Sequence, residues 1–329
     1  MKSIFSFKIM NDMVFRALGH FFLDQLSTRD SFRHIRRLPP IKHLKNTGKI
    51  KMRKSLVALV IVTVGVASSA YSESILEYKF DDNADGNTSV STGSDTAAVT
   101  FFTSNGEATN LHGSAGSGVS GQAGDLAFDN SASSAMGISG AGGSANSGNI
   151  SALNGLSSFT LQGWFNTSGS GTVSGARLFE KNGGAGNDLS LQYSRNVASG
   201  QLVLYLGTPT ATAITGVSSG IDATLGTSNS WVFFAVTYDG TLAENNVKFY
   251  TGNPSSGVTQ VGTTLTLNSG TLSAANAGAL ALGNIASGGD RPWHGLLDNM
   301  RIYGATSGNA GVLTMSQLEA LRAADAAIP

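Results

Sequence analysis

The sequence predicts an all-β protein, a β-sandwich of two antiparallel sheets, and three observations lead to this prediction. Short runs rich in Val, Phe, Tyr, Leu and Thr alternate with Gly, Ser and Asn clusters, roughly every 8–15 residues. Glycine contributes 42 of the 329 residues, about twice its average share, which suits a chain with many turns. Hydrophobic residues make up 41% and charged residues 13% of the chain, so it can build a core and does not resemble a disordered protein.

The first part of the chain has the pattern of an export signal. An apolar run at 56–67 is shorter than the roughly 20 residues that cross a bilayer. It follows the basic stretch Met52-Arg53-Lys54 and precedes small residues, as in a secretory signal peptide. We therefore predict an upstream basic segment outside the mature protein at 1–51, a signal peptide at 52–72 and one domain at 73–329. An unusually long basic region before the signal, or a basic arm, is the alternative for 1–51.

The charge distribution bears on the partner. The 21 basic and 21 acidic residues balance, but 13 of the basic and three of the acidic residues lie in 1–54. The remaining chain has a net charge of −10, from 8 basic and 18 acidic residues, and would repel nucleic acid. It also has no cysteine, which excludes disulfides and thiolate metal sites. We expect a secreted or cell-surface protein with no visible transmembrane anchor.

Eleven segments of the domain have strand character. Phe159, Leu161 and Phe165 share one face of their segment, and 231–238 is apolar on both faces, as in a central strand. The stretch 82–157, including the Gly/Ser-rich 139–149, is predicted as loops between strand-like pieces. The eleven segments are 75–80, 124–128, 158–166, 177–181, 189–193, 201–206, 231–238, 247–251, 265–267, 279–283 and 296–303.

One short helix is predicted near the C-terminus. Thr314 and Gln317 have the spacing of a capping box, in which each side chain bonds the other's backbone N–H. Leu318 and Leu321 then form one apolar stripe, and the pattern continues to about Ala326. We expect this helix to pack against the sandwich.

Several of these segments, in this order, resemble a known family. The series is FTLQGWFN, LFEKNG, LSLQY, WVFFAVTYDGT, VKFYTG, ALALGN, WHGLLDNMRIYG and LTMSQLEAL, preceded by EYKFDDN and GQAGDLAFDN. It resembles the laminin-G-like, concanavalin A-like lectin/glucanase jelly-roll domains of secreted bacterial proteins, over about residues 75–322. The resemblance implies a jelly-roll sandwich. It leaves sugar binding, adhesion, hydrolysis and structural roles open, because this fold serves all of them.

Catalytic patterns are weak in the predicted domain. Glycoside hydrolysis generally needs two carboxylates, which hydrolases of this fold carry as Glu-x-Asp-x-x-Glu, and that spacing is absent. Glu180 is the one glutamate in the middle of a predicted strand, and Asn182 follows it two residues later. His112 and His294 are the two histidines after residue 72, and no Gly-x-Ser-x-Gly elbow precedes a helix. We therefore predict a protein that is not an enzyme.

A bound calcium ion is implied by the resemblance. Members of the family often hold one between the end of the first strand and the penultimate region, which here points to Asp81 or Asp82 and to Asp298. Calcium prefers carboxylate and carbonyl oxygens, which DDNADGN at 81–87 supplies densely. The alternative is that Asp, Asn and Gly there only form a turn.

The loop GGDRPWHG at 288–295 holds the candidate sugar ligands Trp293, His294, Asp290 and Arg291. An aromatic ring can stack on a sugar, while charged groups hold its hydroxyls. Core packing of Trp293 is the alternative reading. We predict a secreted, non-catalytic module that binds an extracellular polysaccharide or surface glycan. The alternative is a structural or adhesive protein that binds surface proteins; a glycoside hydrolase is less favoured.

Overall fold

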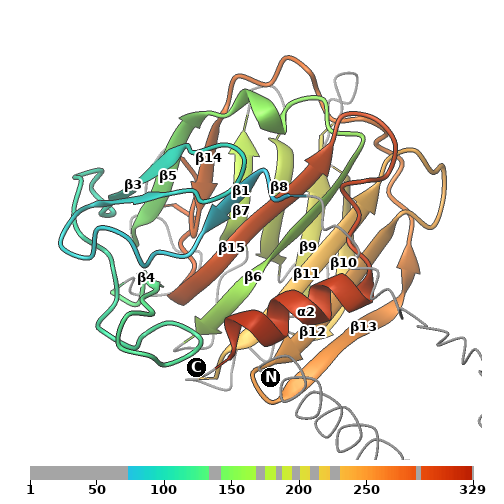
Figure 1. Cartoon of the computed structure of the whole chain (residues 1–329). Helices are drawn as coiled ribbons and strands as arrows, with labels where there is room; N and C mark the ends of the chain where they lie inside the picture. Colours follow the sequence, from blue (N-terminus) through green and yellow to red (C-terminus); the bar gives the residue numbers. More distant parts are fainter. Residues whose placement is uncertain are drawn as a thin grey trace, which may run out of the picture. The chain divides into compact units, whose positions relative to one another are not determined.

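The two predicted sheets are present, and they face each other as the layers of a sandwich (Figure 1). The structure is a computed structural model that describes residues 73–132, 142–167, 175–182, 187–194, 201–207, 215–222, 230–286 and 290–327. The predicted upstream segment and signal peptide lie outside these residues. Strand pairings within both sheets are antiparallel, as predicted.

The first sheet has seven strands in the order β1-β15-β6-β11-β12-β13, with β4 also paired to β15. The second sheet has eight strands in the order β10-β9-β8-β7-β14-β5-β3-β2. The strands of the first sheet are β1 (Leu76–Tyr78), β4 (Phe128–Asp129), β6 (Ser158–Thr167), β11 (Val232–Asp239), β12 (Val247–Asn253), β13 (Ser256–Leu265) and β15 (Gly295–Ala305). Those of the second are β2 (Thr88–Val90), β3 (Ala98–Phe102), β5 (Ser144–Asn149), β7 (Arg177–Asn182), β8 (Asn187–Ser194), β9 (Gln201–Leu206), β10 (Thr215–Asp222) and β14 (Ala279–Leu282).

The main core lies between the two sheets and follows the alternation of the strands. Phe159, Leu161 and Phe165 of β6 all enter it, which confirms the face predicted for this strand. Strand β11 is covered on both sides, because Phe234 enters the main core while Phe233 belongs to a second cluster. Its predicted position as a central strand is thus confirmed.

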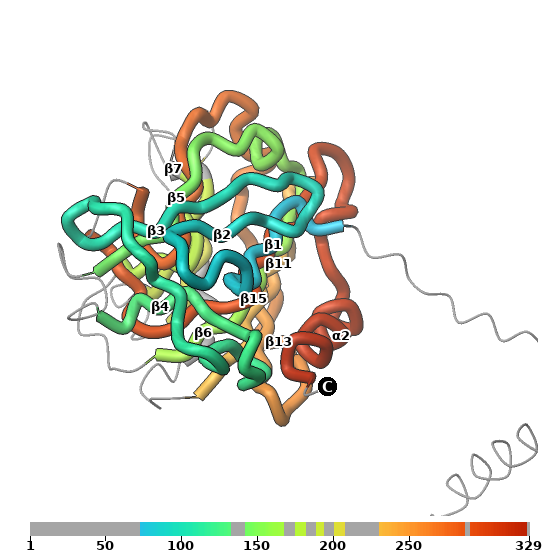
Figure 2. The backbone as a smooth tube through the Cα atoms, turned by 60° about the vertical axis from the view of Figure 1, so that its left-hand side comes forward, coloured from blue at the N-terminus to red at the C-terminus, as the bar shows by residue number. Residues whose placement is uncertain are grey.

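The predicted helix is α2 (Met315–Asp325), which contacts β12 and β13 outside the sandwich (Figure 2). Its capping box forms between Thr314 and Gln317, as the sequence indicated. Leu318 is fully buried against the second cluster, where Trp164 also lies. A short 3-10 helix spans Ser151–Leu153. None of the helices in the described part of the chain is long and apolar enough to cross a membrane.

Several expectations about individual strands were wrong. The stretch 82–157 was predicted as loops between strand-like pieces, yet it contains β2, β3 and β5, and the strand predicted at 124–128 is only the short β4. Strand β10 was not predicted. Within the Gly/Ser-rich 139–149, Ser144–Asn149 forms β5 between β3 and β14. Its small residues have low strand propensity, but pairing on both sides and full burial of Ala145 override that preference. The strand predicted at 265–267 is instead Ser256–Leu265, an edge strand whose polar residues face water.

Candidate functional site

The chain turns sharply where β1 ends, and this turn places two of the predicted metal ligands. Phe80 has a φ of 61°, which is unusual for a bulky residue, and its ring is fully buried between the sheets. The next residue, Asp81, accepts a hydrogen bond from the backbone N–H of Leu126 through Oδ1 at 2.8 Å. Asp82 instead accepts bonds from Ser89 Oγ and Val90 N, so it closes the connection to β2.

Asp298 lies in β15 at an irregularity of the sheet. The register of β15 against β6 shifts between Asp298 and Arg301, and Asn299 has a φ of 49°. The Asp298 carboxylate is fully buried and accepts bonds from Val119 N at 2.8 Å and Asn299 N at 2.6 Å. Burial raises the pKa of Asp298 well above its usual range, and the negative charge of Asp125 raises it further.

A polar cavity of about 310 Å³ lies beside these carboxylates. It lies at the end of β1, next to the 120–125 loop, Asn299 and the C-terminal end of α2. Asp81 and Asp125 both line it, so the structure brings Asp81 near a carboxylate that the sequence analysis did not single out. Its polar lining comes from Lys79, Asp81, Ser120, Gln122, Asp125, Asn299 and Asp325.

The charge around the cavity is unbalanced. Five carboxylates lie on or next to its wall, with two basic side chains among them; the carboxylates are Glu77, Asp81, Asp125, Asp298 and Asp325, and the basic residues are Lys79 and Arg301. Within the described residues, no group of three or more His, Cys, Asp or Glu side chains is arranged to hold a metal ion by itself. A cation here would therefore need backbone carbonyls or water as further ligands.

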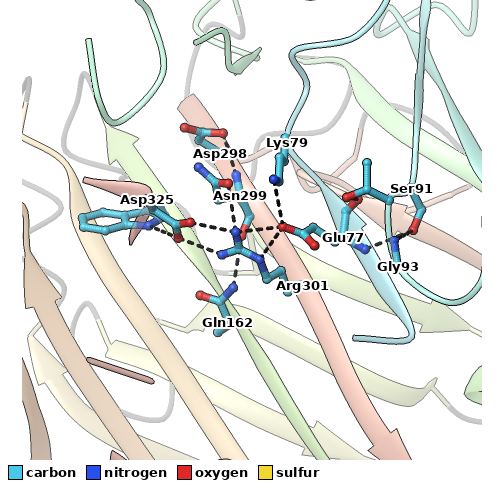
Figure 3. Close-up of polar contacts among 11 residues, drawn as sticks. Glu77, Lys79, Ser91, Gly93, Gln162, Asp298, Asn299, Arg301 and Asp325 are labelled. Carbon is cyan, nitrogen blue, oxygen red and sulfur yellow. Dashed lines mark hydrogen bonds and ion pairs between the residues drawn. The ribbon is translucent and has the colours of Figure 1, made fainter. Parts of the chain in front are cut away.

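Arg301 joins this region to the helix through a buried network (Figure 3). Its guanidinium donates two hydrogen bonds of 2.7 Å to the Asp325 carboxylate and one of 2.9 Å to Glu77. Burial lowers the pKa of Arg301, but Asp325 and Glu77 outweigh it and hold that pKa above its usual value. Trp164 Nε1 also donates to Asp325 at 2.9 Å, so this one carboxylate fixes the end of α2 to the sheet.

The predicted sugar ligands at 290–294 do not form one group. Trp293 is fully buried in the main core, where its ring packs against Phe165 with centroids 5.0 Å apart. A sugar could not reach that ring, so Trp293 takes the core role left open by the sequence. Asp290 is exposed, and Arg291 and His294 are half-buried.

Arg291 lies beside Arg177 of β7, which in turn pairs with Glu180 of the same strand; the sequence alone did not group these three residues. The carbonyl of Arg291 accepts a bond from Arg177 N, and both arginine side chains lie around Gly175. A Cβ built on Gly175 would stand 2.9 Å from Arg291 Cδ and 3.5 Å from Arg177 Nη1. Arg177 Nε donates to Glu180 Oε2 at 2.8 Å, and Glu180 is 1% exposed. We call Arg177, Glu180 and Arg291 the arginine cluster.

Solved structures with a similar fold are found at low sequence identity. Domain 4 of the GH43 extracellular arabinanase AbnA from Geobacillus stearothermophilus, in complex with arabinotriose, is 15% identical with a TM-score of 0.49, covering 77% of this chain and 99% of that one. The CBM40 of a Ruminococcus gnavus IT-sialidase, bound to α2,3 sialyllactose, is 13% identical with a TM-score of 0.37, covering 60% and 95%. The botulinum neurotoxin serotype C1 binding domain is 14% identical with a TM-score of 0.44, covering 77% and 52%. At these identities and TM-scores, the similarity does not indicate what this chain binds.

The family is shown by sequence. No curated protein matches the chain, but the model of the Laminin_G_3 family, described as the concanavalin A-like lectin/glucanases superfamily, matches residues 139–310. This match covers more than half of the chain and includes the strands from β5 to β15. It agrees with the two antiparallel sheets and with the order of motifs in the sequence. The chain therefore belongs to the concanavalin A-like lectin/glucanase superfamily.

Proposed function

We propose that the chain is an exported, non-catalytic module that binds an extracellular glycan. The observation that carries this proposal is the arginine cluster, in which charged groups held by β7 meet the loop before β15. A guanidinium offers several hydrogen-bond donors in a fixed plane, and a carboxylate accepts bonds from sugar hydroxyls. The exposed Asp290 and half-buried His294 on the same loop provide further polar contacts at its edge.

The ion pair of Glu180 supports the proposal of binding without hydrolysis. Hydrolysis generally uses one carboxyl group as proton donor and a second carboxylate across the bond. Glu180 forms an ion pair with Arg177 at 2.8 Å and is only 1% exposed. We therefore assign Glu180 to holding the Arg177 guanidinium in position, and Arg177 and Arg291 to contact with the glycan.

We further propose that a calcium ion is held beside the cavity at the end of β1. Asp81 and Asp298 are the two carboxylate ligands we assign to it, completed by backbone carbonyls or water, while Asp82 serves the turn in which it is bonded. Carboxylate oxygens are the donors that calcium prefers. A bound Ca²⁺ would supply the positive charge that offsets the excess of carboxylates and the buried charge of Asp298.

A glycan array probed with the full chain, in calcium and in EDTA, tests the proposed function. We expect binding to at least one oligosaccharide, with no release of reducing ends. Glu180→Gln should weaken that binding about tenfold, because it removes the charge-assisted bond that holds the Arg177 guanidinium in position. Glu244→Gln is the matched control, because Glu244 is exposed in the β11–β12 loop, and it should bind like the wild type.

Two results would reject the proposal. Cleavage of an oligosaccharide by the wild-type chain would make it a hydrolase. Calcium-dependent self-association with no glycan bound anywhere on the array would instead favour the structural or adhesive role.

A further inference from the structure

We propose that His112 fixes the connection between β1 and β2 in a pH-dependent way. When its imidazole carries two protons, it binds two backbone carbonyls of this connection at once, and after losing one proton it binds only one of them. We call residues 80–88, from the end of β1 to the first residue of β2, the β1–β2 turn. The inference is separate from glycan binding, because it concerns how firmly this turn is held.

The β1–β2 turn needs support from outside because its backbone is strained. Phe80 has a φ of 61° and Asn83 a φ of 54°, both in the left-handed region that residues with a side chain rarely adopt. Phe80 is the costlier of the two, since asparagine tolerates this conformation better than a bulky residue does. Such conformations cost free energy and persist where surrounding contacts hold them.

The segment that runs beside β4 supplies this support through two side chains. Asn110 Nδ2 donates a hydrogen bond of 2.8 Å to the carbonyl oxygen of Ala84, in the middle of the turn. His112 Nδ1 lies 2.8 Å from the carbonyl oxygen of Phe80, and His112 Nε2 lies 3.2 Å from that of Thr88. One imidazole ring thus faces both ends of the turn.

The His112 ring is held in this orientation by its neighbours. It is half-buried and packs edge-on against the ring of Phe101 in β3, with centroids 4.8 Å apart and an angle of 84° between the planes. Its backbone forms a β-bridge to Phe128 of β4. Both ring nitrogens therefore keep facing carbonyl oxygens whether or not the ring is charged.

Two carbonyl partners make these contacts depend on protonation. A carbonyl oxygen only accepts hydrogen bonds, so each ring nitrogen must carry a proton to bond one. The imidazolium has two N–H groups and the neutral ring has one. Neutral His112 therefore bonds one carbonyl and turns an unprotonated nitrogen toward the other. Because histidine ordinarily loses its second proton near pH 6.5, roughly, the second bond is present below that range and is lost as the pH rises through it.

The charged side chains on the surrounding elements do not take over this role. In the described part of the chain, none of them forms a hydrogen bond or ion pair with the ring, so its polar partners are the two carbonyls. Those on the β1–β2 turn and next to it, after β3 and in β4 are Lys79, Asp81, Asp82, Asp85, Glu107 and Asp129.

Hydrogen exchange of the backbone amides tests the inference. Protection of the peptide that covers the β1–β2 turn is measured in the full chain at about pH 5.5 and about pH 8, on either side of the usual histidine range, and corrected for the chemical exchange rate. We expect wild-type protection to be about tenfold greater at the lower pH, the effect of about one hydrogen bond. His112→Gln, whose amide does not titrate, should show equal protection at both pH values. His294→Gln is the matched control, because it removes a histidine from the loop before β15 and should keep the wild-type difference.

The outcomes decide the inference in either direction. Equal protection of the turn at both pH values in the wild type would overturn it, and this measurement needs no substitution. A tenfold difference that persists in His112→Gln would overturn it as well, because another group would then be responsible. Asp298 is present in all three chains, so its own effect on stability is common to them.

Discussion

Asp325 carries the largest single contribution that we expect from the buried polar network. Its carboxylate accepts both 2.7 Å bonds from Arg301 and the bond from Trp164 Nε1, and its side chain is 4% exposed. In Asp325→Asn the charge is lost, and the one remaining acceptor oxygen cannot serve both guanidinium donors and the indole. Removing one partner of a buried ion pair typically costs about 3–5 kcal/mol. Glu77 still contacts Arg301, so we expect the lower end, about 3 kcal/mol.

Urea unfolding of the full chain, followed by tryptophan fluorescence, measures this cost. The emission of folded Asp325→Asn should also change, because Trp164 loses its charged acceptor. Glu319→Gln is the control: Glu319 pairs with Arg322 on the same helix, but its side chain is 40% exposed, so its loss should cost about 1 kcal/mol or less. A cost below 1 kcal/mol for Asp325→Asn, equal to the control, would refute the role assigned to the network.

The remaining predictions concern the cavity and the arginine cluster. Calcium should raise the melting temperature of the full chain and EDTA should reverse this, while Asp298→Asn should abolish the response; no shift in the wild type would count against the ion. Burial raises the pKa of Asp298 in the folded state above that of an ordinary aspartate, so the folded form holds this proton more tightly. In EDTA the free energy of unfolding should therefore fall as pH rises from about 4 through the folded pKa of Asp298, and calcium should suppress that fall; a flat profile in EDTA would contradict it. Gly175→Ala should weaken glycan binding at least tenfold in calorimetry, because a Cβ 2.9 Å from Arg291 Cδ would displace that side chain and a φ of 104° strains an alanine backbone; wild-type affinity would refute this.

The sequence predicted those strands and helices whose apolar pattern and capping residues match the burial that the folded structure gives them. The residues of β6 alternate between the main core and the side of the second cluster. The capping box of Thr314 and Gln317 marks the start of α2. Strand β5 carries no such signal, since Ser, Gly and Asn favour turns and its pairing partners come from distant parts of the chain. Strand β13 was missed because an edge strand needs little apolar surface.

The candidate site was predicted in fragments. Asp81 and Asp298 were predicted as metal ligands from the order of the family's motifs, and that role stays a prediction; Asp125, which lies in GQAGDLAFDN, gave no separate signal. The bond between Glu77 and Arg301 joins residues 224 positions apart, which spacing cannot reveal. The role of Trp293 was ambiguous because its burial depends on contacts with residues that are distant in sequence, such as Phe165.

A crystal structure of the full chain with its strongest-binding oligosaccharide tests the central claim most directly. We expect uncleaved sugar residues bonded to the side chains of Arg177 and Arg291. Sugar bound away from these two arginines, or a cleaved glycosidic bond, would contradict the proposed non-catalytic glycan-binding module with its site at the arginine cluster.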